Sequence, residues 1–295
     1  MSTRYDSLIT SLRDEQYIAE KEIATALFLA DQLGKPILIE GEAGVGKTEI
    51  ARVLARMKDT ELIRLQCYEG LDFNSVLYEW NYQKQILSLR INELRQNHDI
   101  SIDDVFSKEY LMNRPILTAL TAEKRVVLLL DEVDRADEEF EALLLESLAE
   151  YQVTIPEYGT IQSKFPPYVI LTSNRTRELT DALRRRCLYL WISYPSYEKE
   201  LQIIEMKVPG IQPAMAAQIT SIVQALRLES LNKVPGVAES IDWAKALQSF
   251  GIEVLDKESM KDSVGCILKD RQDIAKFKNE WVDRLLSKAG NGNGC

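Results

Sequence analysis

The residues best suited to chemistry lie in one run early in the chain. This run is Gly41, Glu42, Ala43, Gly44, Val45, Gly46, Lys47 and Thr48. It follows an apolar segment at 36–39 and precedes a helical pattern at 49–57. Glycines let successive main-chain N–H groups turn toward an anion, the Lys47 ammonium can reach the terminal phosphates, and the Thr48 hydroxyl can ligate magnesium. The run therefore predicts a site for ATP or GTP with Mg²⁺, and the following helix points its positive dipole end at the same anion.

A second candidate group ends an apolar run. Residues 126–130 are all Val or Leu, and Asp131 and Glu132 follow directly. The run is too short for a helix and predicts a buried parallel strand. Asp131 would hold the magnesium, usually through water, and Glu132 would orient and deprotonate the water that attacks the terminal phosphate. Alternatively, Asp131 caps the next helix and Glu132 is a solvated loop acid, which leaves unexplained why an apolar strand delivers both acids.

Two further candidates follow later strand patterns. Asn174 ends the segment 167–174, where its amide could bind the attacking water or the terminal phosphate, or simply start a turn with Arg175. A short predicted helix ends in Arg184, Arg185 and Arg186. These arginines could be a solvated helix end, or they could stabilise the transferring phosphate in a neighbouring subunit's site as an arginine finger.

The elements that must position these residues alternate between strands and helices. Strands are predicted at 37–40, 61–67, 126–132, 167–174 and 187–192, helices at 15–33, 49–57 and 137–151, and a hairpin at 153–162. This alternation predicts an α/β fold with a parallel five-stranded sheet flanked by helices. A longer connection at about 71–115 predicts an insertion with a strand-like and a helical part. Its alternating aromatic residues, Tyr78, Trp80 and Tyr82, are expected to pack in the core.

Strand patterns stop at residue 195. Helical patterns follow at 198–206, 213–226, 241–250 and from 257 to the late 280s. We therefore expect a nucleotide-binding α/β core at 1–194 and a smaller all-α lid domain at 195–289. The glycine-rich tail at 290–295 is expected to be disordered.

Composition limits the class of protein. The chain has 295 residues, of which 45% are hydrophobic and 28% charged, as in a globular protein of about two domains. Without a long apolar stretch or a signal-peptide core, we expect a cytoplasmic protein with no transmembrane segment. The formal net charge of −10 repels phosphate backbones, so no nucleic-acid partner is expected.

Cysteine and histidine offer no further site in the sequence. The only histidine, His98, lies in a polar stretch and is expected in an exposed loop. The widely spaced cysteines suggest neither a disulfide framework nor a zinc site; they are Cys67, Cys187, Cys266 and Cys295.

Taken together, the runs resemble the AAA+ ATPases over nearly the whole chain. The resemblance rests on residues 41–48, 126–132, 171–174 and 183–186, followed by a helical lid. Residues 131–136 and 151–156 are similar to the MoxR branch of these ATPases. The stretches at 65–70, 78–83 and 173–179 are similar to MoxR ATPases encoded with carbon monoxide dehydrogenase and related molybdenum hydroxylases, and they are more specific than the phosphate run.

The resemblance implies an activity and partners. It implies a homo-oligomer, usually a hexameric ring, that hydrolyses ATP to ADP and phosphate with Mg²⁺ and acts as a chaperone. The client would be a molybdenum hydroxylase whose metal cofactor is matured, and the adaptor would carry a von Willebrand factor A domain. Asn174 would be the first sensor, and Arg186 matches the finger position better than Arg185.

One departure and two alternatives accompany the resemblance. Relatives carry a nucleotide-contacting lid arginine near residues 235–242, where this chain has none, so Lys233 or Lys245 could take its place. The first alternative is a nucleic-acid motor or clamp loader built on the same sheet. The second is a scaffold that assembles on ATP and hardly turns over, although such a scaffold needs neither Glu132 nor Arg186.

Overall fold

The structure is a computed structural model that describes residues 4–94 and 102–290. The chain forms two compact units. The first contains residues 21–40, 48–191 and the start of the chain to Leu8, and the second contains residues 9–20, 41–47 and those from Ile192 onward. His98 and all but the first residue of the tail predicted at 290–295 lie outside the described residues.

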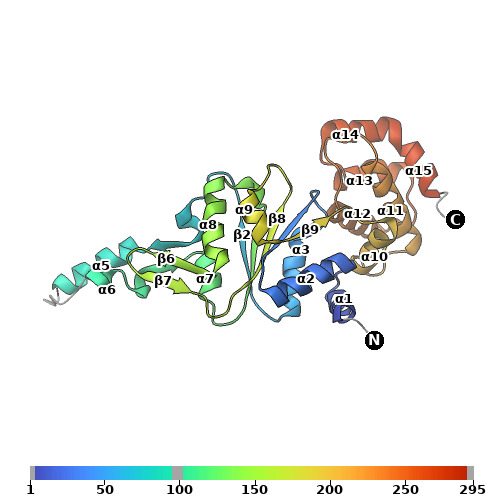
Figure 1. Cartoon of the computed structure of the whole chain (residues 1–295). Helices are drawn as coiled ribbons and strands as arrows, with labels where there is room; N and C mark the ends of the chain where they lie inside the picture. Colours follow the sequence, from blue (N-terminus) through green and yellow to red (C-terminus); the bar gives the residue numbers. More distant parts are fainter. Residues whose placement is uncertain (1–3, 95–101, 291–295) are drawn as a thin grey trace. The chain divides into compact units, whose positions relative to one another are not determined.

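A five-stranded sheet forms the centre of the first unit and confirms the predicted α/β fold (Figure 1). Its strand order is β2-β5-β8-β1-β9, with parallel pairing along β2, β5, β8 and β1. The strands are β1 (Ile37–Gly41), β2 (Leu62–Gln66), β5 (Val127–Asp131), β8 (Tyr168–Ser173) and β9 (Leu188–Ile192). In the register of the sheet, Gln66 lies opposite Asp131. The carboxyl ends of these strands, which carry the polar candidates, therefore meet at one edge.

Helices cover both faces of the sheet. Figure 1 shows α7 (Pro115–Leu120) and α8 (Glu138–Ala149) on one side and α2 (Lys21–Leu33) and α3 (Lys47–Met57) on the other. All five residues of β5 are buried, which explains why its apolar run is uninterrupted. The helix predicted at 15–33 begins only at Lys21, as α2, and is therefore shorter than expected. A separate helix, α1 (Arg4–Asp14), precedes it, and the positive φ of Gln16, 57°, interrupts the helical backbone between the two.

The insertion contains a small antiparallel pair and short helices. Its elements are α4 (Phe73–Val76), β3 (Tyr78–Trp80), α5 (Tyr82–Leu94), α6 (Ile102–Val105), η1 (Lys108–Tyr110) and β4 (Leu111–Asn113). Tyr78 and Trp80 are buried as expected, and Trp80 packs edge-on against Phe106 with ring centroids 5.2 Å apart. The core prediction is wrong for Tyr82, which is 60% exposed because β3 ends at Trp80 and Tyr82 starts a helix.

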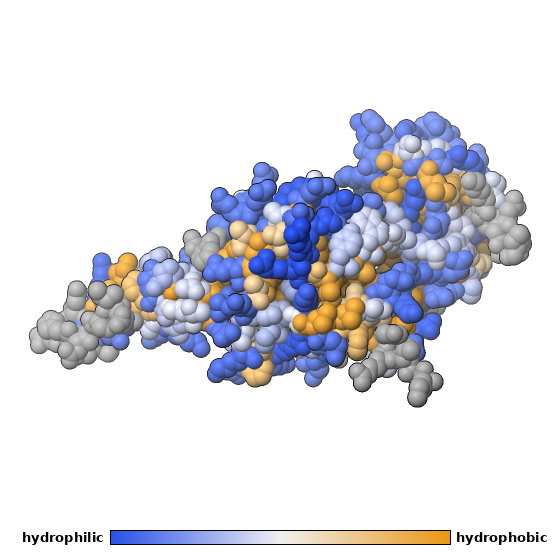
Figure 2. All heavy atoms as spheres, viewed as in Figure 1, coloured by the Kyte–Doolittle hydropathy of each residue, from blue (hydrophilic) through white to orange (hydrophobic). Residues whose placement is uncertain are grey.

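The exposed surface of the insertion is partly apolar. Figure 2 shows orange, hydrophobic atoms among blue ones on the visible face of this part of the chain. Helix α5 contributes Ile86, Leu87, Leu89 and Ile91 to the exposed large hydrophobic residues.

Farther along the chain, the predicted hairpin is present as the antiparallel strands β6 (Gln152–Ile155) and β7 (Gly159–Gln162).

The second unit carries the C-terminal helices, which form the smaller all-α part of the predicted fold. They are α10 (Tyr197–Lys207), α11 (Pro213–Arg227), α12 (Val237–Ser249), α13 (Lys257–Ser263), α14 (Arg271–Lys276) and α15 (Val282–Gly290), with the short 3-10 helix η3 (Val264–Cys266) and the π-helix η4 (Phe277–Trp281). Their apolar residues form one core that includes Trp243 and Phe277. The helical pattern from 257 onward is divided because Asp270 caps a new helix by accepting the N–H groups of Gln272 and Asp273.

Within residues 4–94 and 102–290, each helix is too short or too polar to cross a bilayer.

Candidate functional site

Residues 41–47 link β1 to the first turn of α3. Gly44 and Gly46 have φ angles of 76° and 93°, a region that side chains with a Cβ rarely adopt, so glycine is required at both positions. The Lys47 ammonium is buried and donates hydrogen bonds to the main-chain oxygens of Gly41 at 2.8 Å and Glu42 at 2.7 Å. The loop therefore curls around its own lysine.

The same loop packs against the segment that starts α12, within the second unit. The Val237 N–H donates to the Gly44 carbonyl at 2.8 Å, and the Tyr194 hydroxyl donates to the Ala43 carbonyl at 3.3 Å. A Cβ built on Gly44 would lie 2.8 Å from the Gly236 Cα, so the two backbones touch. Sequence reasoning missed Gly236 as a partner of the loop; its only signal was a Pro-Gly pair ahead of a helix.

An arginine near the expected lid position supports this segment. The Arg227 guanidinium forms two 2.6 Å hydrogen bonds with the Glu200 carboxylate, and its Nε donates to the Pro235 carbonyl at 2.9 Å. Both side chains are almost fully buried, at 6% and 0% exposed. Because a buried charge needs its partner, this pair holds the residues just before Gly236 in place.

Thr48 and Asp131, which are predicted to bind the same metal ion, are hydrogen-bonded to each other in the first unit. They are 83 residues apart in the sequence. The Thr48 hydroxyl donates to Asp131 Oδ1 at 2.9 Å. The N-cap of α8 is Asp137, whose carboxylate accepts the Phe140 N–H, so Asp131 is not the cap of that helix. The carboxylate that ends β5 is therefore directed toward the first turn of α3.

Thr172, which sequence reasoning missed, connects the two predicted acids. Its hydroxyl donates to Asp131 Oδ1 at 2.6 Å and accepts the Glu132 N–H at 2.9 Å. Glu132 adopts a left-handed φ of 56°, a conformation uncommon outside glycine and asparagine that marks many functional positions. Its side chain is 30% exposed and pairs with the Arg135 Nε at 2.8 Å. Glu132 thus remains accessible to solvent beside the buried Asp131.

Asp131 also binds a cation within the chain. Arg64 of β2 donates to Asp131 Oδ2 through Nε at 3.1 Å and Nη2 at 2.6 Å. The Arg64 side chain is 44% exposed, whereas that of Asp131 is 4% exposed. Nothing in the sequence pattern of β2 predicted this ion pair.

Asn174 follows β8 in a turn that is anchored by a buried carboxylate. Asp134, 2% exposed in η2 (Val133–Arg135), accepts the Asn174 N–H at 3.2 Å. The Thr176 N–H and hydroxyl both donate to Asp134 Oδ2 at 2.8 Å. Asp134, which follows Glu132 closely in the chain, therefore positions the turn that carries Asn174. The sequence alone did not predict this role for Asp134.

The arginine helix, α9 (Asp181–Arg186), is anchored in a similar way. The Thr180 N–H and hydroxyl donate to Glu141 Oε2 at 2.8 and 2.6 Å, and Glu141 is fully buried. Arg184 lies over the Tyr189 ring, 5.5 Å from its centroid. Arg185 and Arg186 are exposed, and neither forms an ion pair within residues 4–94 and 102–290. The end of α9 thus presents two guanidinium groups at the surface.

The acids at and after the end of β5 also act on a buried cysteine. Cys67 is buried, and burial together with the nearby charges of Asp131, Asp134 and Glu132 raises the pKa of its thiol to about 12. The thiol is therefore protonated at neutral pH.

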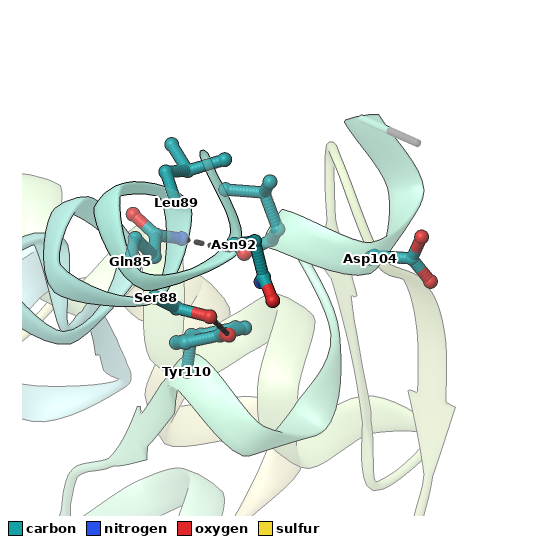
Figure 3. Close-up of a pocket in the computed structure, with 7 residues that line it drawn as sticks. Gln85, Ser88, Leu89, Asn92, Asp104 and Tyr110 are labelled. Carbon is teal, nitrogen blue, oxygen red and sulfur yellow. Dashed lines mark hydrogen bonds between the residues drawn. The ribbon is translucent and has the colours of Figure 1, made fainter. Parts of the chain in front are cut away.

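A separate small hollow lies in the insertion (Figure 3). Its volume is about 100 Å³, and two hydrogen bonds cross its lining, from Gln85 to the Val105 carbonyl and from Tyr110 to Ser88, both 2.7 Å long. The lining also includes Leu89, Asn92 and Asp104. None of the predicted nucleotide-site residues lines it.

Comparison with known proteins identifies the family. The sequence profile of the AAA domain (dynein-related subfamily) matches residues 36–187, which is more than half of the chain. The chain belongs to this AAA family. The match contains the phosphate loop (residues 41–48), Asp131, Glu132, Asn174 and the arginine helix. These residues, all predicted to act on a nucleotide, therefore lie within the AAA domain.

Individual relatives of this AAA protein are distant. It is 25% identical over 298 residues to the gas vesicle ATPase GvpN of Haloferax mediterranei, covering 92% of this chain and 82% of that protein. It is 24% identical over 281 residues to the uncharacterized protein YeaC of Bacillus subtilis, covering 91% and 75% of the two chains. Among solved structures it resembles the RuvB Holliday junction branch migration motor of Thermotoga maritima, with a TM-score of 0.52 and 16% identity over 92% of this chain and 80% of that one. At that identity the last likeness concerns the fold alone.

Proposed function

We propose that this AAA protein binds ATP with Mg²⁺ and hydrolyses it to ADP and phosphate. The observation that carries the proposal is the 2.9 Å hydrogen bond from the Thr48 hydroxyl to Asp131 Oδ1. It joins the residue after the loop lysine to the carboxylate that ends β5, which is the pairing that a nucleotide-bound metal requires. Hydroxyl and carboxylate oxygens are also the ligands that Mg²⁺ prefers, so Thr48 and Asp131 fit this ion.

In this proposal the chain's own groups divide the work. The N–H groups of the loop and the Lys47 ammonium hold the phosphates. Glu132 accepts a proton from the attacking water, and Asn174 orients that water or the terminal phosphate. When bound, Mg²⁺ would neutralise phosphate charge.

The proposal includes a homo-oligomer, a hexameric ring in the simplest case. Arg186, with Arg185 beside it, would supply positive charge to the site of a neighbouring subunit. The exposure of both guanidinium groups at the end of α9 supports this role. Residues 1–194 would form the nucleotide-binding core, and residues 195–289 would form a lid.

The finer biological role rests on resemblance. We propose a cytoplasmic MoxR-branch chaperone that matures the metal cofactor of a molybdenum hydroxylase such as carbon monoxide dehydrogenase, together with a von Willebrand factor A domain adaptor. The stretches at 65–70, 78–83 and 173–179 support this assignment. The match to GvpN, a protein named as a gas vesicle ATPase, supports the ATPase part of the proposal.

Two variants test the proposed activity. Lys47→Ala should abolish nucleotide binding at ordinary ATP concentrations, a loss of affinity of about a hundredfold or more, whereas Glu132→Gln should bind ATP and lose hydrolysis by about a hundredfold or more. Normal hydrolysis by Glu132→Gln would show that Glu132 does not activate the water.

The trapped Glu132→Gln protein also tests the client. With ATP it should retain a molybdenum hydroxylase or its adaptor during affinity capture, identified by mass spectrometry, whereas Lys47→Ala should not. ATPase measurements with single- and double-stranded DNA test the nucleic-acid alternative. We expect no stimulation, because the chain carries a net charge of −10.

A further inference from the structure

We propose that Arg64 is an internal counter-ion that occupies Asp131 in the absence of nucleotide and is displaced when Mg²⁺ arrives with ATP. Arg64 would thereby set the Mg²⁺ concentration that nucleotide binding requires. This inference rests on the proposed nucleotide site and adds to it a residue that controls metal loading.

The hydrogen bonds of Asp131 are fully used in the structure. A carboxylate has two oxygens with about four acceptor positions. Oδ1 accepts the hydroxyls of Thr48 and Thr172, and Oδ2 accepts two N–H groups of Arg64. A metal-bound water that donates to Oδ2 must therefore compete with the guanidinium.

Charge makes the competition stronger. The positively charged Arg64 guanidinium neutralises Asp131 without help from solvent ions. A divalent cation near the same carboxylate repels that positive charge. Binding of Mg²⁺ and retention of the Arg64 pair consequently oppose each other.

The position of Arg64 lets it leave. It lies on β2, the end strand of the sheet, and its side chain is 44% exposed. The main chain of Arg64 pairs with Leu129, two residues before Asp131, so only the side chain reaches the carboxylate. Gln66 accepts a hydrogen bond from the same guanidinium and lies on the same side of β2, which gives the arginine a second partner.

The buried pair of Arg227 and Glu200 provides a contrast within the chain. There the guanidinium is 6% exposed and also bonds to the Pro235 carbonyl, so its release would leave buried groups without partners. Arg64 can exchange Asp131 for water, because almost half of its side chain already contacts solvent. We therefore assign Arg227 a structural role, and we assign Arg64 the role of a counter-ion that Mg²⁺ can displace from Asp131.

The test measures nucleotide binding as Mg²⁺ is titrated. A fluorescent, non-hydrolysable ATP analogue is added to full-length wild type, Arg64→Met and Arg64→Lys, starting in EDTA. We expect Arg64→Met to lower the half-saturating Mg²⁺ concentration roughly two- to fivefold, the range of a partly exposed ion pair. Arg64→Lys keeps the charge but loses the bidentate contact, so its half-saturating Mg²⁺ concentration should lie between those of wild type and Arg64→Met.

Arg284→Met is the matched control. Arg284 is 47% exposed and pairs with Glu229 at 2.6 Å, much like Arg64 with Asp131, but it lies on α15 in the other unit. Its Mg²⁺ requirement should equal that of wild type. Thermal melting checks that each variant is folded, and MgATP should raise the melting temperature more for Arg64→Met than for wild type.

Three results would overturn the inference. An unchanged Mg²⁺ requirement in folded Arg64→Met would show that Arg64 does not compete with the metal. A higher requirement would make Arg64 a fixed support that positions Asp131. If wild type bound no analogue at any Mg²⁺ concentration, the proposed function itself would fail, and the inference with it.

Discussion

Gly236 lies so close to Gly44 that a Cβ built on Gly236 would be 2.6 Å from the Gly44 Cα. The contact joins the residue that precedes α12 to the middle of the phosphate loop, and the Val237 N–H strengthens it by donating to the Gly44 carbonyl. Backbone cannot yield as a flexible side chain can. We therefore expect a displacement of the loop at Gly44 to move the start of α12 as well.

The first prediction concerns this contact. Gly236→Ala should destabilise the protein by about 1–3 kcal/mol, the typical penalty for overpacking, and should weaken ATP binding because the loop is pushed from its position. Gly265→Ala is the control, because a Cβ there meets no atom within 4 Å. Denaturant unfolding and nucleotide titration measure both effects, and equal behaviour of the two variants would contradict the account.

The second prediction concerns Thr172, which bonds to both Asp131 and the Glu132 main chain. Thr172→Val keeps the shape but leaves a buried N–H unpaired, which costs about 1–3 kcal/mol. Hydrolysis should fall roughly ten- to a hundredfold, as for other residues that orient metal ligands, with nucleotide binding less affected. Thr172→Ser should restore most of the rate; a Thr172→Val enzyme with an unchanged kcat would show that this hydroxyl does not matter.

The third prediction concerns Asp134, which accepts the N–H groups of Asn174 and Thr176 and the Thr176 hydroxyl. Asp134→Ala should lower the free energy of unfolding by about 3 kcal/mol, because buried donors lose their acceptor. It should also slow hydrolysis at saturating ATP, since the Asn174 turn is released.

Asp137→Ala provides the comparison for Asp134. It removes the N-cap of α8, a change worth about 1 kcal/mol, without touching that turn. Single-turnover rates at a temperature where both variants are folded separate stability from chemistry. Equal rates in the two variants would remove Asp134 from the positioning role.

The fourth prediction tests whether Arg186 acts in a neighbouring subunit. Arg186→Ala should reduce hydrolysis by about a hundredfold, and Arg185→Ala should reduce it less. When Arg186→Ala and Glu132→Gln proteins are mixed in equal amounts, about a quarter of interfaces should combine an intact Glu132 with an intact Arg186. Activity should then return in proportion, whereas a mixture as inactive as its components would place the arginine in its own subunit's site.

Local patterns were sufficient to predict much of the fold. The glycine run was recognisable because Gly44 and Gly46 need conformations that other residues rarely adopt. The strand before Asp131 was recognisable because a strand buried on both faces is apolar throughout. Local patterning also marked Asn174 and the arginines of α9, although their roles remain predictions.

Contacts between distant segments could not be predicted in this way. Arg64 and Asp131 are 67 residues apart and meet only because β2 and β5 pair in one particular register. Asp134 and Gly236 likewise gain their partners from tertiary packing. Tyr82 was assigned to the core because its alternation with Trp80 looked strand-like, but the strand ends at Trp80 and Tyr82 starts helix α5.

Equilibrium binding of ATP in the presence of Mg²⁺ tests the central claim most directly. Purified full-length protein should bind ATP, Mg²⁺ should strengthen that binding, and Lys47→Ala should weaken it by about a hundredfold or more because the loop loses its ammonium. If the folded wild-type protein failed to bind ATP with Mg²⁺ present, or if Lys47→Ala bound it equally well, the proposed nucleotide site would be contradicted.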